Sequence, residues 1–134
     1  MAVITSVVDT YKLSDVLKHQ YGVESNFTQE RVIVNEASGL TYGIGTVLGK
    51  VTATGKYKRQ EASAVDGSQT AAAVVLEDKT VTAATDTGVL VLVRGPAIVN
   101  KARLVMGAST DLQAEKDAVY ASLAALGILA NTGI

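Results

Sequence analysis

Short stretches of β-branched residues, separated by turn signals, fill the chain from Phe27 to Val105, and they constrain the fold more than any other feature. Residues 47–56 alternate apolar and polar side chains, as expected for a strand with one buried face. Residues 89–93 form a continuous apolar run with glycines near both ends, which indicates a buried strand. Pro96 cannot donate to a strand ladder, so it marks a bulge or an edge between two extended pieces. The pattern predicts further strands at residues 28–34, 71–76 and 79–83.

One helix is predicted near the C-terminus, over residues 111–126. Thr110 stands at the N-cap position and Gln113 follows three residues later, which matches a T-x-x-Q capping box. Leucines, alanines and a valine recur at helical spacing through this segment, and Gly127 is expected to end the helix. The predicted fold class is therefore mainly β with one C-terminal helix, an α+β fold.

The composition indicates one domain with an interior of small side chains. The chain has 134 residues and a mass of 13.9 kDa, which suits a single domain. Hydrophobic residues make up 48% but aromatic residues only 4%, and tryptophan is absent. Burial energy scales with apolar area, so such a core stabilises less per residue than one rich in Leu and Phe. A partner subunit that covers more surface would add stability.

Several classes of function are excluded or disfavoured by the residue inventory. Cysteine is absent, which excludes disulfides, thiolate nucleophiles and cysteine-bearing zinc sites, and the single His19 cannot form a multi-histidine metal cluster. The net charge is −1 and the basic residues are scattered, which argues against a nucleic-acid partner. No apolar run reaches the roughly 18–20 residues of a membrane span, and the N-terminus does not resemble a signal peptide. We expect neither a membrane nor a cofactor or metal as partner.

Glycine-rich and charged motifs do not form a catalytic constellation. Residues 43–49 resemble a loose dinucleotide fingerprint, but a predicted strand follows where the helix should begin. His19 with Asp15 and Ser14 could be drawn as part of a triad, yet nothing indicates an oxyanion hole, so a surface histidine is the better account. The basic cluster of Lys56, Lys58 and Arg59 is interpreted as solvated charge, with contact to an acidic protein surface as the alternative. We therefore predict no catalytic residue and no enzyme activity.

Residues 1–26 differ from the rest of the chain and allow two interpretations. The first residues are apolar and β-branched, and residues 11–18 are compatible with a short, weakly amphipathic helix. One interpretation is a frayed end or a first core strand. The other is an arm that docks on a partner.

The ordered set of motifs in the β region resembles the head decoration proteins of lambda-like tailed bacteriophages. The resemblance covers roughly residues 26–130, and no single motif is diagnostic. It rests on residues 26–28 with 30–34, 45–51, 54–57, 66–76, 91–97 and 126–128, in that order.

The resemblance implies a non-enzymatic virion protein with a small β-rich fold, often called a β-tulip. It implies a homotrimer that sits on the outer surface of the expanded capsid, at three-fold and quasi-three-fold positions, and stabilises the head against internal DNA pressure. Such a protein would be made in the host cytoplasm. On this basis residues 1–26 are an N-terminal arm and residues 27–134 the decoration domain. The arm would contact the major capsid protein through the residues Val3, Ile4, Thr5, Val7, Val8 and Tyr11.

A free-standing β-rich module that binds carbohydrate or peptide is the alternative function. Carbohydrate sites usually present aromatic platforms. The chain has only one Phe and five Tyr, and two of these tyrosines precede residue 26. This shortage disfavours the carbohydrate-binding alternative.

Overall fold

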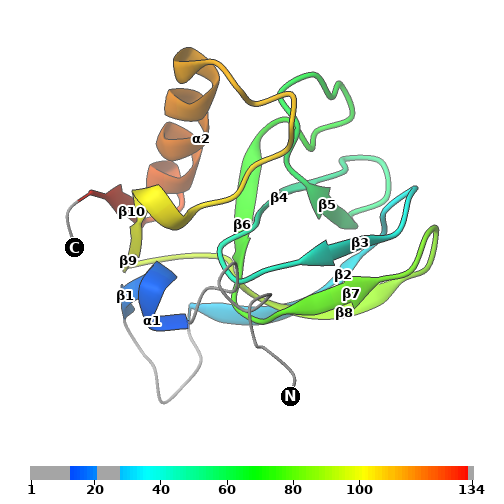
Figure 1. Ribbon diagram of the computed structural model, residues 1–134, viewed down its shortest axis with the longest axis horizontal. Helices are drawn as coiled ribbons and strands as arrows, with labels where there is room; N and C mark the ends of the chain where they lie inside the picture. Colours follow the sequence, from blue (N-terminus) through cyan, green and yellow to red (C-terminus); the bar gives the residue numbers. More distant parts are fainter. Residues whose placement is uncertain (1–12, 21–27, 133–134) are drawn as a thin grey trace, which may run out of the picture.

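The computed structural model describes residues 13–20 and 28–132, and it confirms a mainly β fold with a C-terminal helix (Figure 1). The elements follow in the order α1 (Leu13–Val16), β1 (Leu17–Gln20), β2 (Gln29–Val34), β3 (Leu40–Tyr42), β4 (Val47–Lys50), β5 (Tyr57–Arg59), β6 (Ala71–Val75), β7 (Lys79–Val81), β8 (Thr87–Leu92), β9 (Ala97–Asn100), the 3-10 helix η3 (Lys101–Arg103), α2 (Gln113–Ala125) and β10 (Ile128–Asn131).

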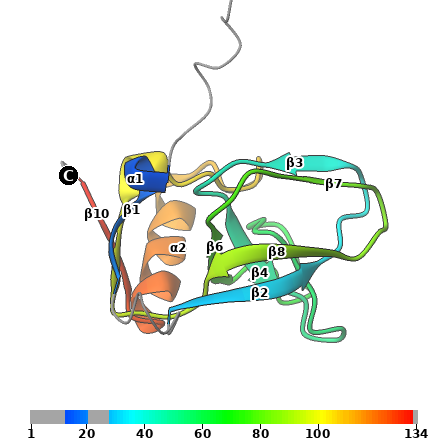
Figure 2. The ribbon, with the colours of Figure 1, turned by 90° about the horizontal axis from the view of Figure 1, so that it is seen from below.

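Five strands close into a barrel in the order β2-β5-β4-β6-β8. Strands β2 and β8 are paired antiparallel along their whole length, from Gln29 opposite Leu92 to Val34 opposite Thr87. The barrel closes between β2 and β5 through one parallel pair, Val34 opposite Tyr57. Strands β3 and β7 form a separate two-stranded ribbon beside the barrel (Figure 2).

A second layer lies beside the barrel. It is a three-stranded sheet in the order β1-β9-β10, in which β9 pairs antiparallel with β1 and parallel with β10. Helix α2 packs against β10 on one side and β6 on the other, so it lies between this sheet and the barrel (Figure 2). The chain leaves the barrel for the sheet at Pro96, between β8 and β9.

The period of two along the barrel strands divides their side chains between two cores. In β6, Ala73 and Val75 point into the core inside the barrel, whereas Val74 contributes to the core beneath α2. In β8, Val91 faces the first core and Leu92 the second. Both faces of these strands are therefore buried, as the continuous apolar run at residues 89–93 predicted.

The strand predicted over residues 47–56 is shorter in the structure and ends at Lys50. Beyond it the chain turns: Gly55 N donates to Val51 O (2.8 Å), and Val51 N donates to Lys56 O (2.8 Å). Gly55 has a φ of +72°, a conformation that glycine adopts without strain. The alternation of Val and Thr continued past the point where this tight turn reverses the chain, so sequence pattern overestimated the strand.

Helix α2 is shorter than the predicted 111–126, and Thr110 is not its N-cap. The backbone amides of Asp111 and Leu112 donate instead to Glu115 Oε1, at 3.2 and 3.0 Å. Thr110 is buried, and its hydroxyl donates to Gln60 Oε1 (2.8 Å). The Thr110 side chain, which the local pattern assigned to the helix cap, is thus hydrogen-bonded to Gln60, fifty residues away in sequence. The predicted stop is confirmed, since α2 ends just before Gly127, which has a φ of +87°.

The structure also changes the account of residues 1–26, because Leu13–Gln20 fold against the rest of the chain. Val16 is fully buried in the core beneath α2, and β1 pairs with β9. The short helix predicted over 11–18 is found only at Leu13–Val16, and residues 17–20 are a strand. Two contacts hold this segment: Val16 packs in the core beneath α2, and β1 pairs with the edge of β9. Residues 13–20 therefore belong to the domain, and an arm could consist only of residues before Leu13.

Candidate interaction surface

The predicted capsid-contact residues Val3, Ile4, Thr5, Val7, Val8 and Tyr11 all lie outside the described residues. The structure defines only where the chain continues from them. Leu13 begins α1, and α1 packs against η3 and β9. Helix α1 therefore fixes the point on the domain from which an arm would extend.

The glycines that resembled a nucleotide motif have a structural role. Gly45 has a φ of +101°, and a Cβ there would lie 2.5 Å from Arg103 O. Its neighbourhood is held by backbone bonds to Val105: Val105 N donates to Gly45 O (2.9 Å), and Val47 N donates to Val105 O (2.8 Å). Strand β4 follows directly, so no helix N-terminus is present to bind a pyrophosphate.

The predicted basic cluster is paired with carboxylates of the same chain. Lys56 Nζ lies 3.0 Å from Asp86 Oδ2, and Lys58 Nζ lies 3.3 Å from Asp66 Oδ2. Arg59 Nη2 lies 3.0 Å from Glu61 Oε2. These ion pairs are part-exposed and contribute little individually. The three basic side chains that could bind an acidic partner are therefore already paired within the chain.

The long segment between β5 and β6 is fastened to residues 107–110. Glu61 Oε1 accepts hydrogen bonds from the hydroxyl and amide of Ser109, at 2.6 and 3.1 Å. Burial alone would raise the pKa of Glu61, but the bonds from Ser109 and the charge of Arg59 outweigh it and lower the pKa. At the far end of the segment, bonds from Ser68 and then Lys58 lower the pKa of Asp66 to about 2. Both carboxylates are therefore ionised and engaged at neutral pH.

The residues that could be drawn as part of a triad lie on two neighbouring elements. His19 lies in β1, where its backbone is opposite Ile98, while Asp15 lies in α1. Within residues 13–20 and 28–132, no group of three or more His, Cys, Asp or Glu side chains is placed to hold a metal ion. None of the described helices has both the length and the apolar character required to cross a membrane.

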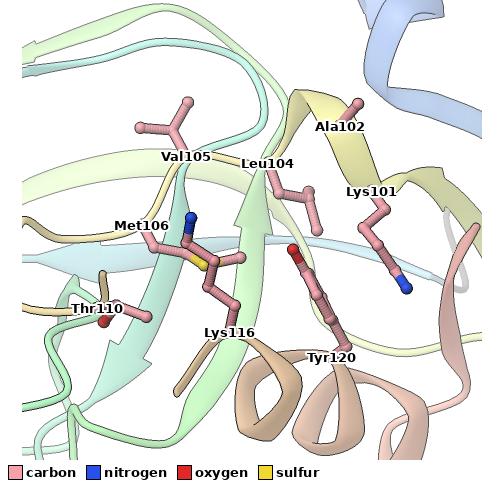
Figure 3. A pocket seen from close by; sticks show the side chains of 8 residues that line it. All are labelled: Lys101, Ala102, Leu104, Val105, Met106, Thr110, Lys116 and Tyr120. Atoms are coloured by element: carbon pink, nitrogen blue, oxygen red, sulfur yellow. The ribbon is translucent and has the colours of Figure 1, made fainter. Parts of the chain in front are cut away.

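A cavity of about 430 Å³ opens between η3, the segment after it and α2 (Figure 3). Lys116 and Tyr120 rise from α2, one turn apart, while Leu104, Val105 and Met106 come from the facing segment. The described residues that line it are Lys101, Ala102, Leu104, Val105, Met106, Thr110, Lys116 and Tyr120. Burial, and next the charge of Asp117, raise the pKa of Tyr120, so its hydroxyl is neutral.

Three exposed apolar residues belong to the cavity wall or to the segments next to it. Val105, in its wall, is 42% exposed, and Leu112, one helical turn before Lys116, is 63% exposed. Leu13, at the start of the helix that packs on η3, is 40% exposed. These are three of the six large apolar residues that the described chain exposes. Neighbouring exposed apolar residues are typical of an interaction surface. We call Leu13, Val105, Leu112 and the cavity lining the η3–α2 face.

Sequence reasoning missed this face. Lys116 and Tyr120 stand four residues apart on the predicted helix, which places them on one side of it. Their partners at 101–106 belong to an irregular segment with no periodic pattern. Leu112 is one of the leucines that recur at helical spacing in the predicted helix, but it precedes α2 and is exposed.

The sequence matches the protein family described as bacteriophage lambda head decoration protein D over residues 8–128, which is most of the chain. The chain belongs to this family. The resemblance found in the β region is thereby confirmed. Searches of curated proteins and of solved structures found no match. A phage head decoration protein is a structural component of the virion, and the chain accordingly has a structural role on the capsid.

Proposed function

We propose that this head decoration protein is a homotrimeric cement. It joins the outer surface of the expanded head at three-fold and quasi-three-fold positions, after synthesis in the host cytoplasm, and stabilises the shell against internal DNA pressure. The observation that carries the proposal is the family match over residues 8–128. The match also favours this function over a free-standing carbohydrate- or peptide-binding module. The β-tulip description of the fold belongs to the same proposal.

The composition of the core supports a trimer. Val is the commonest of its buried side chains, and Tyr42 is the single aromatic among the buried residues that the structure describes. Small side chains remove little apolar area from water, so the monomer has limited burial energy. Association with two further copies would bury more area and raise stability.

The arm of this proposal consists of residues 1–12, with Val3, Ile4, Thr5, Val7, Val8 and Tyr11 as capsid contacts. An extended, β-branched segment can add to the exposed edge of a sheet, where backbone hydrogen bonds give affinity. Its root is firmly held, because Val16 is fully buried and β1 pairs with β9. Three arms on one trimer would also reinforce each other by raising the effective concentration of each.

Deletion of residues 1–12 tests the proposal. We expect the shortened chain to keep its fold and its trimeric mass, because it retains the buried Val16 and the pairing of β1 with β9. Its affinity for expanded heads that lack decoration protein should fall sharply, measured by co-sedimentation with the heads. Deletion of Met1 and Ala2 alone is the matched control, since it removes none of the six contacts and should bind like the full chain.

Undiminished binding after deletion of residues 1–12 would refute the arm. A full-length protein that sediments as a monomer of 13.9 kDa, both alone and on release from heads, would refute the trimer.

A further inference from the structure

The η3–α2 face combines apolar walls with two lysines that take part in none of the described ion pairs. Leu104, Val105 and Met106 form the apolar side of the cavity, and Lys101 and Lys116 bring two ammonium groups to it. None of the described residues that line the cavity carries a carboxylate. Within the described chain, five ion pairs join other lysines and arginines to carboxylates, and neither Lys101 nor Lys116 takes part in one of them.

The two lysines are held in place by packing. Lys101 Nζ lies 4.7 Å from the centre of the Tyr120 ring, within the range of a cation–π interaction. Lys116 projects from α2 beside Met106 (Figure 3). A complementary ligand would therefore present an apolar side chain to the wall and a carboxylate to the lysines. An acidic-apolar segment of a protein has this chemistry.

The position of the face on the fold indicates which protein supplies that segment. Helix α1 packs on η3, and Leu13 at its start is one of the exposed apolar residues of the face. Leu13 is also the first described residue, so the described chain starts beside η3. In the proposed function the residues before Leu13 lie on the capsid, so the cavity would be next to the same surface.

A second copy of the chain is a weaker candidate for the occupant. Val65 is 95% exposed and is followed by Asp66, so the pair has the required apolar and acidic groups. However, the Asp66 carboxylate already accepts hydrogen bonds from Ser68 (2.6 Å from its hydroxyl) and from Lys58 (3.3 Å). Pairing it with the cavity lysines would require giving up those contacts.

We propose that the η3–α2 cavity is a second docking point for the major capsid protein, which inserts an apolar side chain flanked by Asp or Glu from a surface segment. The inference rests on the proposed function and adds a contact separate from the arm. The arm provides backbone pairing, and the cavity provides a charge-selective anchor near the arm's root.

The charge-reversed double variant Lys101→Glu/Lys116→Glu tests this proposal. Binding of the full-length variant to expanded heads that lack decoration protein should weaken about tenfold or more, and the deficit should shrink as salt rises. The matched control is Lys50→Glu/Lys79→Glu, which changes the net charge equally on β4 and β7 and should bind within about twofold of the original. Ala102→Trp, at an exposed position of the lining, tests the site by obstruction without a charge change and should also weaken binding.

The possible results separate the two proposals. Equal binding by the cavity variants and the control would overturn the docking point while leaving the arm intact. Loss of the trimer in the cavity variants, seen by sedimentation, would assign the face to contacts between copies and also overturn it. If the unaltered protein fails to bind heads at all, the proposed function falls, and the docking point falls with it.

Discussion

Individual glycines allow the closest approaches in this fold. A Cβ at Gly49 would overlap the backbone oxygen of Ser68 and lie 2.5 Å from its Cα. The register between β4 and β6 shifts between Leu48 and Gly49. The backbone of the buried Ser68 lies against Gly49 at this point. At this point only hydrogen fits between the two backbones.

We predict that Gly49→Ala lowers the free energy of unfolding by about 1–3 kcal/mol, because the backbone of Ser68 or of β4 must shift. Gly88→Ala is the matched control in another barrel strand, where the nearest atom to a Cβ is the flexible Arg31 Cδ at 3.5 Å. Denaturant unfolding of both variants at one protein concentration measures the difference. Equal stability of the two variants would contradict the close approach.

At the residue scale, the sequence predicts the features that depend on neighbours in the chain. Gly127 was recognised as the helix stop because a left-handed residue after a helix favours glycine. Thr110 was assigned wrongly because its partner, Gln60, lies on another segment. The cavity lysines could not be assigned at all, since only the fold brings η3 and α2 together.

At the scale of elements, one carboxylate closes the barrel where strand pairing is weakest. Strands β2 and β5 share a single pair of residues, and Glu36 follows just after β2. Glu36 Oε2 accepts a hydrogen bond from the amide of Arg59 (2.7 Å) and a short one from the hydroxyl of Tyr42. Burial, and next the bond to Glu36, raise the pKa of Tyr42. The carboxylate thereby joins β3 and β5 to the end of β2.

We expect Glu36→Ala to lower the free energy of unfolding by about 1–3 kcal/mol, because it leaves the buried Tyr42 hydroxyl and the Arg59 amide without their acceptor. Glu36→Gln should cost less, since its amide oxygen can still accept. Glu30→Ala serves as control: it breaks an exposed ion pair with Arg94 and should cost less than about 1 kcal/mol. If Glu36→Ala unfolds at the same urea concentration as Glu30→Ala, the claim that Glu36 closes the barrel between β2 and β5 is wrong.

Strands with a clear sequence pattern were predictable as elements, and several of the short ones were not. The predicted segments 28–34, 71–76, 79–83 and 89–93 correspond to β2, β6, β7 and β8. Strands β3, β5 and β10 have three or four residues each, which is too short for alternation to be recognised. Their pairing partners lie far away in sequence, so the barrel order was beyond prediction.

At the scale of the whole molecule, two modest cores are joined through shared strands. Val is the commonest residue in each core, and β6 and β8 contribute to both. The composition predicted a core of small side chains, and the family resemblance predicted the structural role on the capsid. It did not predict that residues 13–20 belong to the domain, because β1 needs the edge of β9 to form.

The proposed arm and the proposed docking cavity are next to each other on the domain. The arm's root at Leu13 and the η3–α2 cavity lie side by side, since α1 packs directly on η3. A trimer that presents this face to the shell would use three arms and three cavities together. Under these two proposals, the domain would lie on the capsid with its η3–α2 face inward.

A reconstructed density map of expanded heads, first stripped of decoration protein and then incubated with this chain, tests the central claim most directly. The account predicts clusters of three domains on the outer surface at three-fold and quasi-three-fold positions, with the start of α1 turned toward the shell. Heads that remain bare at saturating protein, or that carry single domains at other positions, would contradict it.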